Sequence, residues 1–117
     1  MEKILKLGCA CEKPGSGYTE FRSSTIGTDH TGSRHAEVST QQCKLCQRIW
    51  IVYTVPVQTG DQQGMLRWFK GIVSKKDRPY ITPENALEHL ESLEWYVYGE
   101  TRPESTAAFG EGKINLN

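Results

Sequence analysis

The arrangement of apolar and polar positions along the chain predicts several β-strands and one helix. The strongest strand signal is segment 49–57 (IWIVYTVPV), where branched and aromatic residues occupy both alternating sets of positions. Such a strand is expected to be covered on both faces. Segment 59–64 carries two glycines and predicts a turn, after which 65–73 returns as the partner strand of a hairpin.

Weaker patterns predict further strands, at 3–11, 18–24, 35–42, 95–99 and 106–109. Segment 35–42 has only Ala36 and Val38 as apolar residues, so it is expected to be an edge strand or one half of a polar hairpin. Segment 25–34 contains glycine, aspartate and serine with a single aliphatic residue, which predicts a loop.

A helix is predicted from about Pro83 to Glu94. Thr82 is the expected N-cap, proline is favoured in the first helical turn, and Glu84 suits the positive end of the helix dipole. Apolar residues then follow at helical spacing: Ala86, Leu87, Leu90 and Leu93. The predicted fold class is therefore α+β, an antiparallel β-sheet with one helix packed on it.

Length and composition limit the classes of protein to which the chain can belong. Its 117 residues are predicted to form one domain, 1–117, with a modest apolar fraction of 37%. No apolar run approaches the roughly 18 residues of a membrane span, and the N-terminal segment lacks the apolar stretch of a signal peptide. We therefore expect a cytoplasmic protein with no membrane partner.

Charge is balanced overall but uneven along the chain. Lysine and arginine number 14, as do aspartate and glutamate, which argues against a strongly basic nucleic-acid binder. Segment 44–78 nevertheless carries seven basic residues against two acidic ones, a net charge of +5, and segment 79–117 has a net charge of −5. The simplest interpretation is two solvated surfaces that attract one another.

Four cysteines, the only ones in the chain, form the most specific pattern. They come as two close pairs, Cys9 with Cys11 and Cys43 with Cys46, separated by 31 residues. Two pairs of thiolates can supply the four corners of a tetrahedral Zn²⁺ site. The prediction is a structural zinc site that joins the N-terminal segment to the turn at 43–46. Two disulfides or four free thiols are the alternatives, of which disulfides are disfavoured in a reducing compartment.

The cysteine spacing resembles that of a zinc ribbon, in which two cysteine pairs lie at the ends of β-hairpins. The resemblance covers the first half of the chain and implies a closed, structural metal site. Two features depart from the ribbon pattern: Gln47 stands where glycine usually follows the second pair, and the first pair has one intervening residue instead of two.

Other residues give weaker signals. His30 and His35 could replace a cysteine ligand or act as acid and base, although histidines in polar segments are more often plain surface residues. The hairpin aromatics, with basic residues beside them, could stack nucleic-acid bases or could form the core. These residues are Arg48, Trp50, Tyr53, Arg67, Trp68, Phe69 and Lys70.

Three functions are consistent with these patterns. The preferred one is a non-catalytic zinc-binding module whose partner is another protein. The first alternative is a nucleic-acid-binding zinc protein that uses the hairpin at 48–78, and the second is an enzyme of unknown class. Four cysteine ligands would leave no position for a zinc-bound water, which disfavours zinc catalysis. Glutamates of the helix are expected to oppose Lys70, Lys75 and Lys76, which disfavours nucleic acid.

Overall fold

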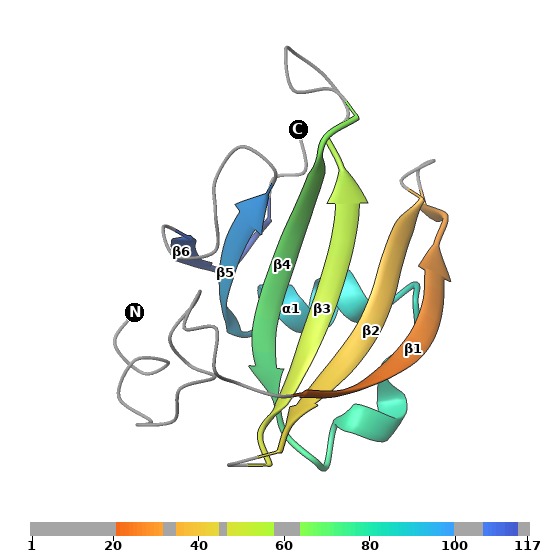
Figure 1. Cartoon of the computed structure of the whole chain (residues 1–117), viewed down its shortest axis with the longest axis vertical. Coiled ribbons are helices and arrows are strands. Elements are labelled where there is room, and N and C mark those ends of the chain that lie inside the picture. Colours follow the sequence, from red (N-terminus) through yellow and green to blue (C-terminus); the bar gives the residue numbers. More distant parts are fainter. Residues whose placement is uncertain (1–20, 32–34, 45–46, 58–63, 100–106, 115–117) are drawn as a thin grey trace.

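A computed structural model describes residues 21–31, 35–44, 47–57, 64–99 and 107–114 of the chain. Six strands form one antiparallel sheet in which the strand order follows the chain order (Figure 1). The strands are β1 (Phe21–Asp29), β2 (Ala36–Cys43), β3 (Ile49–Pro56), β4 (Leu66–Val73), β5 (Glu94–Gly99) and β6 (Ala108–Glu111). A 3₁₀ turn, η3 (Arg78–Tyr80), and a short helix, α1 (Ala86–Glu91), lie between β4 and β5.

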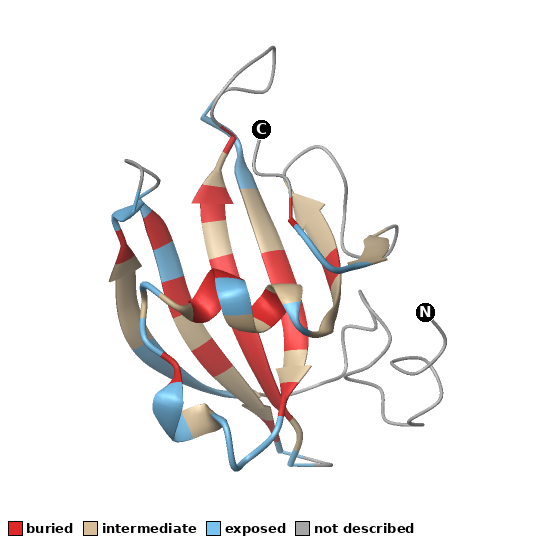
Figure 2. Ribbon diagram, turned by 180° about the vertical axis from the view of Figure 1, so that it is seen from behind, coloured by how far each residue is buried: buried red, intermediate tan, exposed pale blue. Residues whose placement is uncertain are grey.

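Helix α1 covers one face of the sheet, over the central strands (Figure 2). It buries Ala86, Leu87 and Leu90 against a core that includes Ile51 and Phe69. Gly71 of β4 permits this close approach, because a Cβ atom there would lie 2.9 Å from Leu90 Cδ2. Among the described residues no helix is long and apolar enough to cross a membrane.

Strand β3 is buried on both faces, as its two apolar sets predict. Ile51 and Tyr53 contribute to the core beneath α1. Trp50 belongs to a second cluster on the opposite face, with Cys43 and Tyr96. All five side chains are essentially inaccessible to solvent. The predicted hairpin is confirmed, because β3 pairs with β4 from Ile49–Val73 to Pro56–Leu66.

The predicted fold class, α+β with a helix at about 83–94 and a four-cysteine zinc site, is wrong for the described part of the chain. The described fold is mostly a six-stranded antiparallel sheet with one short helix, and its residues include no cluster of three or more potential metal ligands. The helix begins at Ala86, after a turn in which Thr82 and Asn85 form the reciprocal hydrogen bonds of a capping box. Thr82 N–H donates to Asn85 Oδ1 at 2.7 Å, and Asn85 N–H donates to Thr82 Oγ1 at 3.2 Å. It ends early because Glu94 already pairs with Glu111 in the sheet.

Strands β1 and β2 also differ from the predictions. Strand β2 is internal, between β1 and β3, and not at an edge; the alternative, one half of a hairpin, is confirmed because β2 pairs antiparallel with β1. Strand β1 continues through the segment predicted as a loop. A register shift lies between Thr25 and Gly27, where Gly27 has a φ of +151°. A Cβ atom at Gly27 would lie 2.8 Å from Pro83 Cγ, so the bulge lets the turn before α1 pack closely over β1. The predicted strand at 3–11 lies outside the described residues.

Candidate functional site

Of the four predicted zinc ligands, Cys43 is the one that the structure describes. It is the last residue of β2 and is fully buried. Cys9, Cys11 and Cys46 lie outside the described residues. The structural Zn²⁺ site therefore stays a prediction, to which the described part of the chain adds the position of one thiol.

The turn that follows Cys43 has a defined backbone geometry. Gln47 N–H donates to the Cys43 carbonyl at 2.9 Å, and Cys43 N–H donates to the Arg48 carbonyl at 2.9 Å. Gln47 has a φ of +66°, in the left-handed region that favours glycine. Gln47 thus adopts, at some conformational cost, a backbone conformation that glycine adopts readily.

Side-chain amides reinforce the same turn. Gln42 Nε2 donates to Gln47 Oε1 at 3.2 Å and to the Gln47 carbonyl at 3.3 Å. Gln47 Nε2 donates to the Lys44 carbonyl at 3.1 Å. These contacts explain how a glutamine is held in a conformation that it seldom adopts.

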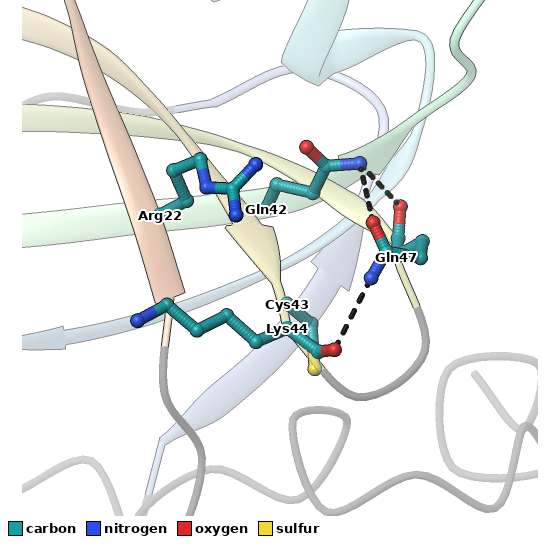
Figure 3. Close-up of a pocket in the computed structure, with 5 residues that line it drawn as sticks. All are labelled: Arg22, Gln42, Cys43, Lys44 and Gln47. Carbon is teal, nitrogen blue, oxygen red and sulfur yellow. Dashed lines mark hydrogen bonds between the residues drawn. The ribbon is translucent and has the colours of Figure 1, made fainter.

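A small pocket of about 130 Å³ lies beside this turn, lined by Arg22, Gln42, Cys43, Lys44 and Gln47 (Figure 3). Arg22 extends from the start of β1 toward Gln42, and the Lys44 side chain runs back from the turn toward β1. The described residues that line the pocket include two cationic side chains and no acidic one. The spacing of Arg22, Gln42 and Gln47 in the sequence does not indicate a shared site, because the pairing of β1 with β2 sets Arg22 opposite Gln42, and the turn after β2 brings Gln47 next to Gln42.

His30 and His35 lie at the other end of β2. Their rings form an edge-to-face contact with centroids 5.3 Å apart, and both residues are exposed. Seven strand residues lie between His35 and Cys43, which places the two residues roughly 25 Å apart at the usual rise per residue. Neither histidine can share a metal ion with Cys43 in this fold.

The aromatic residues of the β3–β4 hairpin are divided between the two faces of the sheet. Tyr53 and Phe69 lie in the core beneath α1, whereas Trp50 lies in the cluster on the opposite face, and all three are at most 2% exposed. Trp68 is half-buried and stacks on Tyr98, with ring centroids 5.3 Å apart. Bases could not stack on the three buried rings without displacing the core.

Lys70 is also buried, at 4% exposure. Its Nζ atom lies 4.7 Å from the ring centroid of Phe21, 5.5 Å from that of Trp50 and 5.9 Å from that of Tyr96. These are cation–π distances, and they explain how a lysine side chain is accommodated among aromatic rings. Because Lys70 faces away from α1, it does not oppose the helix glutamates as the sequence analysis expected.

Strand β1 forms one edge of the sheet. In the described part of the chain it pairs with β2 alone, and Arg22, Ser23, Ser24 and Thr25 are exposed. From Phe21 to Thr25 its register with β2 is regular, and the bulge interrupts it beyond that point. Five residues of regular strand therefore lie at this edge, next to the pocket at the turn.

Comparison of the chain with protein-family models, with curated proteins and with solved structures found no match.

Proposed function

We propose that this chain is a non-catalytic module that binds a protein partner, and that the partner adds an extended segment to the edge of strand β1. The observation that carries the proposal is the five-residue stretch Phe21–Thr25, which is regular in register and mostly exposed. The outer backbone groups of such a strand can pair with a strand from another chain.

The composition of β1 favours this role. Natural edge strands are commonly protected by proline, by several charged residues or by extreme shortness. Strand β1 is nine residues long, contains no proline, and carries one charged residue, Arg22, in its regular half. The bulge at Thr25–Gly27 ends the regular edge, which limits a partner to a short segment.

The other half of β1 is held firmly, which makes the regular half a fixed template. Tyr53 Oη donates to Asp29 Oδ2 at 2.6 Å, and this contact links the end of β1 to the central strand β3. Pro83 packs on the backbone at Gly27. A preformed edge reduces the conformational entropy lost on binding.

Charge complementarity indicates which segments would bind best. Arg22 on β1 and Lys44 at the adjacent turn give this edge a positive character. The favoured occupant is therefore an extended peptide segment with an acidic residue near Arg22. Nucleic acid is the less favoured partner, because the hairpin aromatics that would stack bases are mostly buried.

Selection of random displayed peptides on the immobilised full chain tests the proposal. Selected peptides should bind as strands, and on binding the backbone amides of residues 21–25 that point away from β2 should become protected from hydrogen exchange. Peptides that bind without protecting any of these amides would refute strand addition, as would a selection that yields no binder.

Two neighbouring substitutions give a matched pair of controls. Along an antiparallel strand, successive residues point their N–H groups alternately toward and away from the paired strand. Of Ser23→Pro and Ser24→Pro, one should lose a hydrogen bond to β2 and thus stability, and the other should lose only an outward donor. The proposal requires that the stable variant of the two lose peptide affinity.

A further inference from the structure

Two histidines lie at the end of β2 away from Cys43, on either side of the turn that joins β1 to β2. His30 follows the last residue of β1, Asp29, and His35 precedes the first residue of β2, Ala36. Asp29 and Ala36 pair with each other, so each histidine is the next residue outward on its strand. The register of the hairpin thus brings two imidazole rings together, with centroids 5.3 Å apart and an interplanar angle of 83°.

The nitrogen atoms of these rings are available to a ligand. Both side chains are exposed, and in the part of the chain that the structure describes neither ring takes part in a hydrogen bond or an ion pair. The adjacent carboxylate of Asp29 is buried and accepts hydrogen bonds from Thr31 N–H and Tyr53 Oη. A neutral imidazole has one nitrogen with a free lone pair, which is a common metal ligand.

The separation of the rings suits a shared metal ion. Bonds from Zn²⁺ to imidazole nitrogen are about 2.0–2.1 Å long, so two imidazoles on one tetrahedral ion have ring centres about 5 Å apart. The observed 5.3 Å is close to this value. The torsion that orients a histidine ring has broad energy minima, so exposed rings can turn until one nitrogen of each faces the ion. Binding thus requires rotation of two rings more than movement of the backbone.

The backbone around the pair is arranged in advance. The hydrogen bond from Tyr53 Oη to Asp29 ties the residue before His30 to strand β3. His35 has a φ of +52°, in the left-handed region that few residues other than glycine adopt. Such conformations carry an energetic cost and cluster at ligand sites. Because the paired strands hold both histidines in place, an ion gains two ligands at a small cost in conformational entropy.

We propose that His30 and His35 together bind one divalent transition-metal ion, with one imidazole nitrogen from each and water in the remaining positions. Imidazole suits Ni²⁺, Cu²⁺ and Zn²⁺, whereas Mg²⁺ and Ca²⁺ prefer oxygen ligands. The site differs from the predicted zinc site, because Cys43 lies roughly 25 Å from His35. It is also independent of strand addition, which concerns the backbone at the other end of β1.

Titration of the full chain with NiCl₂, followed by ¹H–¹⁵N NMR, tests the site. The protein is purified without chelators, so that any metal bound by the cysteines stays in place. Ni²⁺ coordinated by imidazole and water is paramagnetic and broadens the signals of nearby nuclei. The backbone amides of Asp29, His30, His35 and Ala36 should broaden and reach a plateau at one Ni²⁺ per chain, and that of Cys43 should stay sharp. An excess of MgCl₂ should not reverse the broadening.

Substitution of each histidine provides a matched control, since the chain has three histidines and the third lies on α1. His30→Gln and His35→Asn should each weaken Ni²⁺ binding about tenfold or more, because a single imidazole remains. Asparagine is chosen at position 35 because it tolerates the left-handed conformation. His89→Gln should change the affinity less than about twofold. His30 and His35 are exposed, so both of their variants should remain folded.

Several results would overturn the proposal. The first is a lack of saturable broadening near His30 and His35, or broadening centred on Cys43, which would place the ion at the cysteines. An equal loss of affinity in all three variants would indicate unspecific binding to imidazoles. A loss in only one of His30→Gln and His35→Asn would indicate a single ligand and not a pair. Reversal of the broadening by Mg²⁺ would indicate a site made of oxygen ligands.

Discussion

Removal of one hydroxyl group, by Tyr53→Phe, would test how the edge strand is held to the centre of the sheet. Tyr53 Oη donates to Asp29 Oδ2 at 2.6 Å, a length typical of a hydroxyl bonded to a carboxylate. Both residues are 0% exposed, so water cannot readily replace the lost donor. The substitution keeps the aromatic ring and hence the packing beneath α1.

The magnitude follows from the charge and burial of this pair. A hydrogen bond to a charged group contributes about 1.5–3 kcal/mol to the free energy of unfolding. Asp29 keeps its bond from Thr31 N–H, at 2.9 Å, so the carboxylate is not fully deprived of donors. We therefore expect a loss of about 1.5–3 kcal/mol, and a melting temperature lower by about 5–15 °C for a chain of this length.

Urea denaturation followed by tryptophan fluorescence measures the change, and Tyr80→Phe is the matched control. Tyr80 is 70% exposed, so loss of its hydroxyl should change the free energy of unfolding by less than about 0.5 kcal/mol. If Tyr53→Phe were no more destabilising than Tyr80→Phe, the inference that this contact secures β1 would be wrong.

Four further predictions concern the core, the bulge, the metal and nucleic acid. Leu90→Ala should cost about 2–5 kcal/mol in urea denaturation, and the half-buried Leu93→Ala clearly less; equal losses would contradict the described packing of α1. Gly27→Ala should lower the melting temperature through backbone strain and contact with Pro83, and the added variant Pro83→Ala should recover part of the loss; no recovery would exclude the contact. Protein purified without chelators should contain about one zinc per chain by mass spectrometry, and Cys46→Ser should remove it; zinc-free protein with four titratable thiols would refute the metal site. A labelled single-stranded oligonucleotide should bind weakly at physiological ionic strength, and micromolar binding that weakens with salt would favour the nucleic-acid alternative.

The sequence identified the β3–β4 hairpin because its apolar residues have a local pattern that indicates burial on both faces. It did not reveal the extent of β1, because Arg22–Thr25 is a polar run whose strand conformation comes from pairing with β2. The helix was predicted too long for a similar reason. Apolar residues at helical spacing continue to Leu93, but Glu94 is already paired with Glu111 of β6. The helix therefore ends before the apolar pattern does.

The zinc site stays a prediction because, of its four cysteines, the structure describes Cys43. The spacing of the cysteines drew attention to the turn at 43–46, and the structure places a pocket beside Cys43. Arg22 lies 21 residues before Cys43 in the sequence. The register of β1 with β2 is what sets Arg22 opposite Gln42, the neighbour of Cys43. Lys70 was expected at the surface because lysine side chains are usually exposed. Its burial depends on the rings of Phe21, Trp50 and Tyr96, which come from β1, β3 and β5.

The sequential strand order has a consequence for how the chain folds. Each described strand pairs with its neighbour in sequence, so each pairing closes a comparatively short loop. None of these strands has to insert between two strands that are already paired. The β3–β4 hairpin, with the strongest local signal, is the natural nucleus on which the flanking strands assemble in turn. Among the described residues, strand β1 pairs with β2 alone, so it should open and close more readily than the centre of the sheet. The same topology that leaves the regular half of β1 accessible to a partner therefore also makes it more prone to open than the central strands.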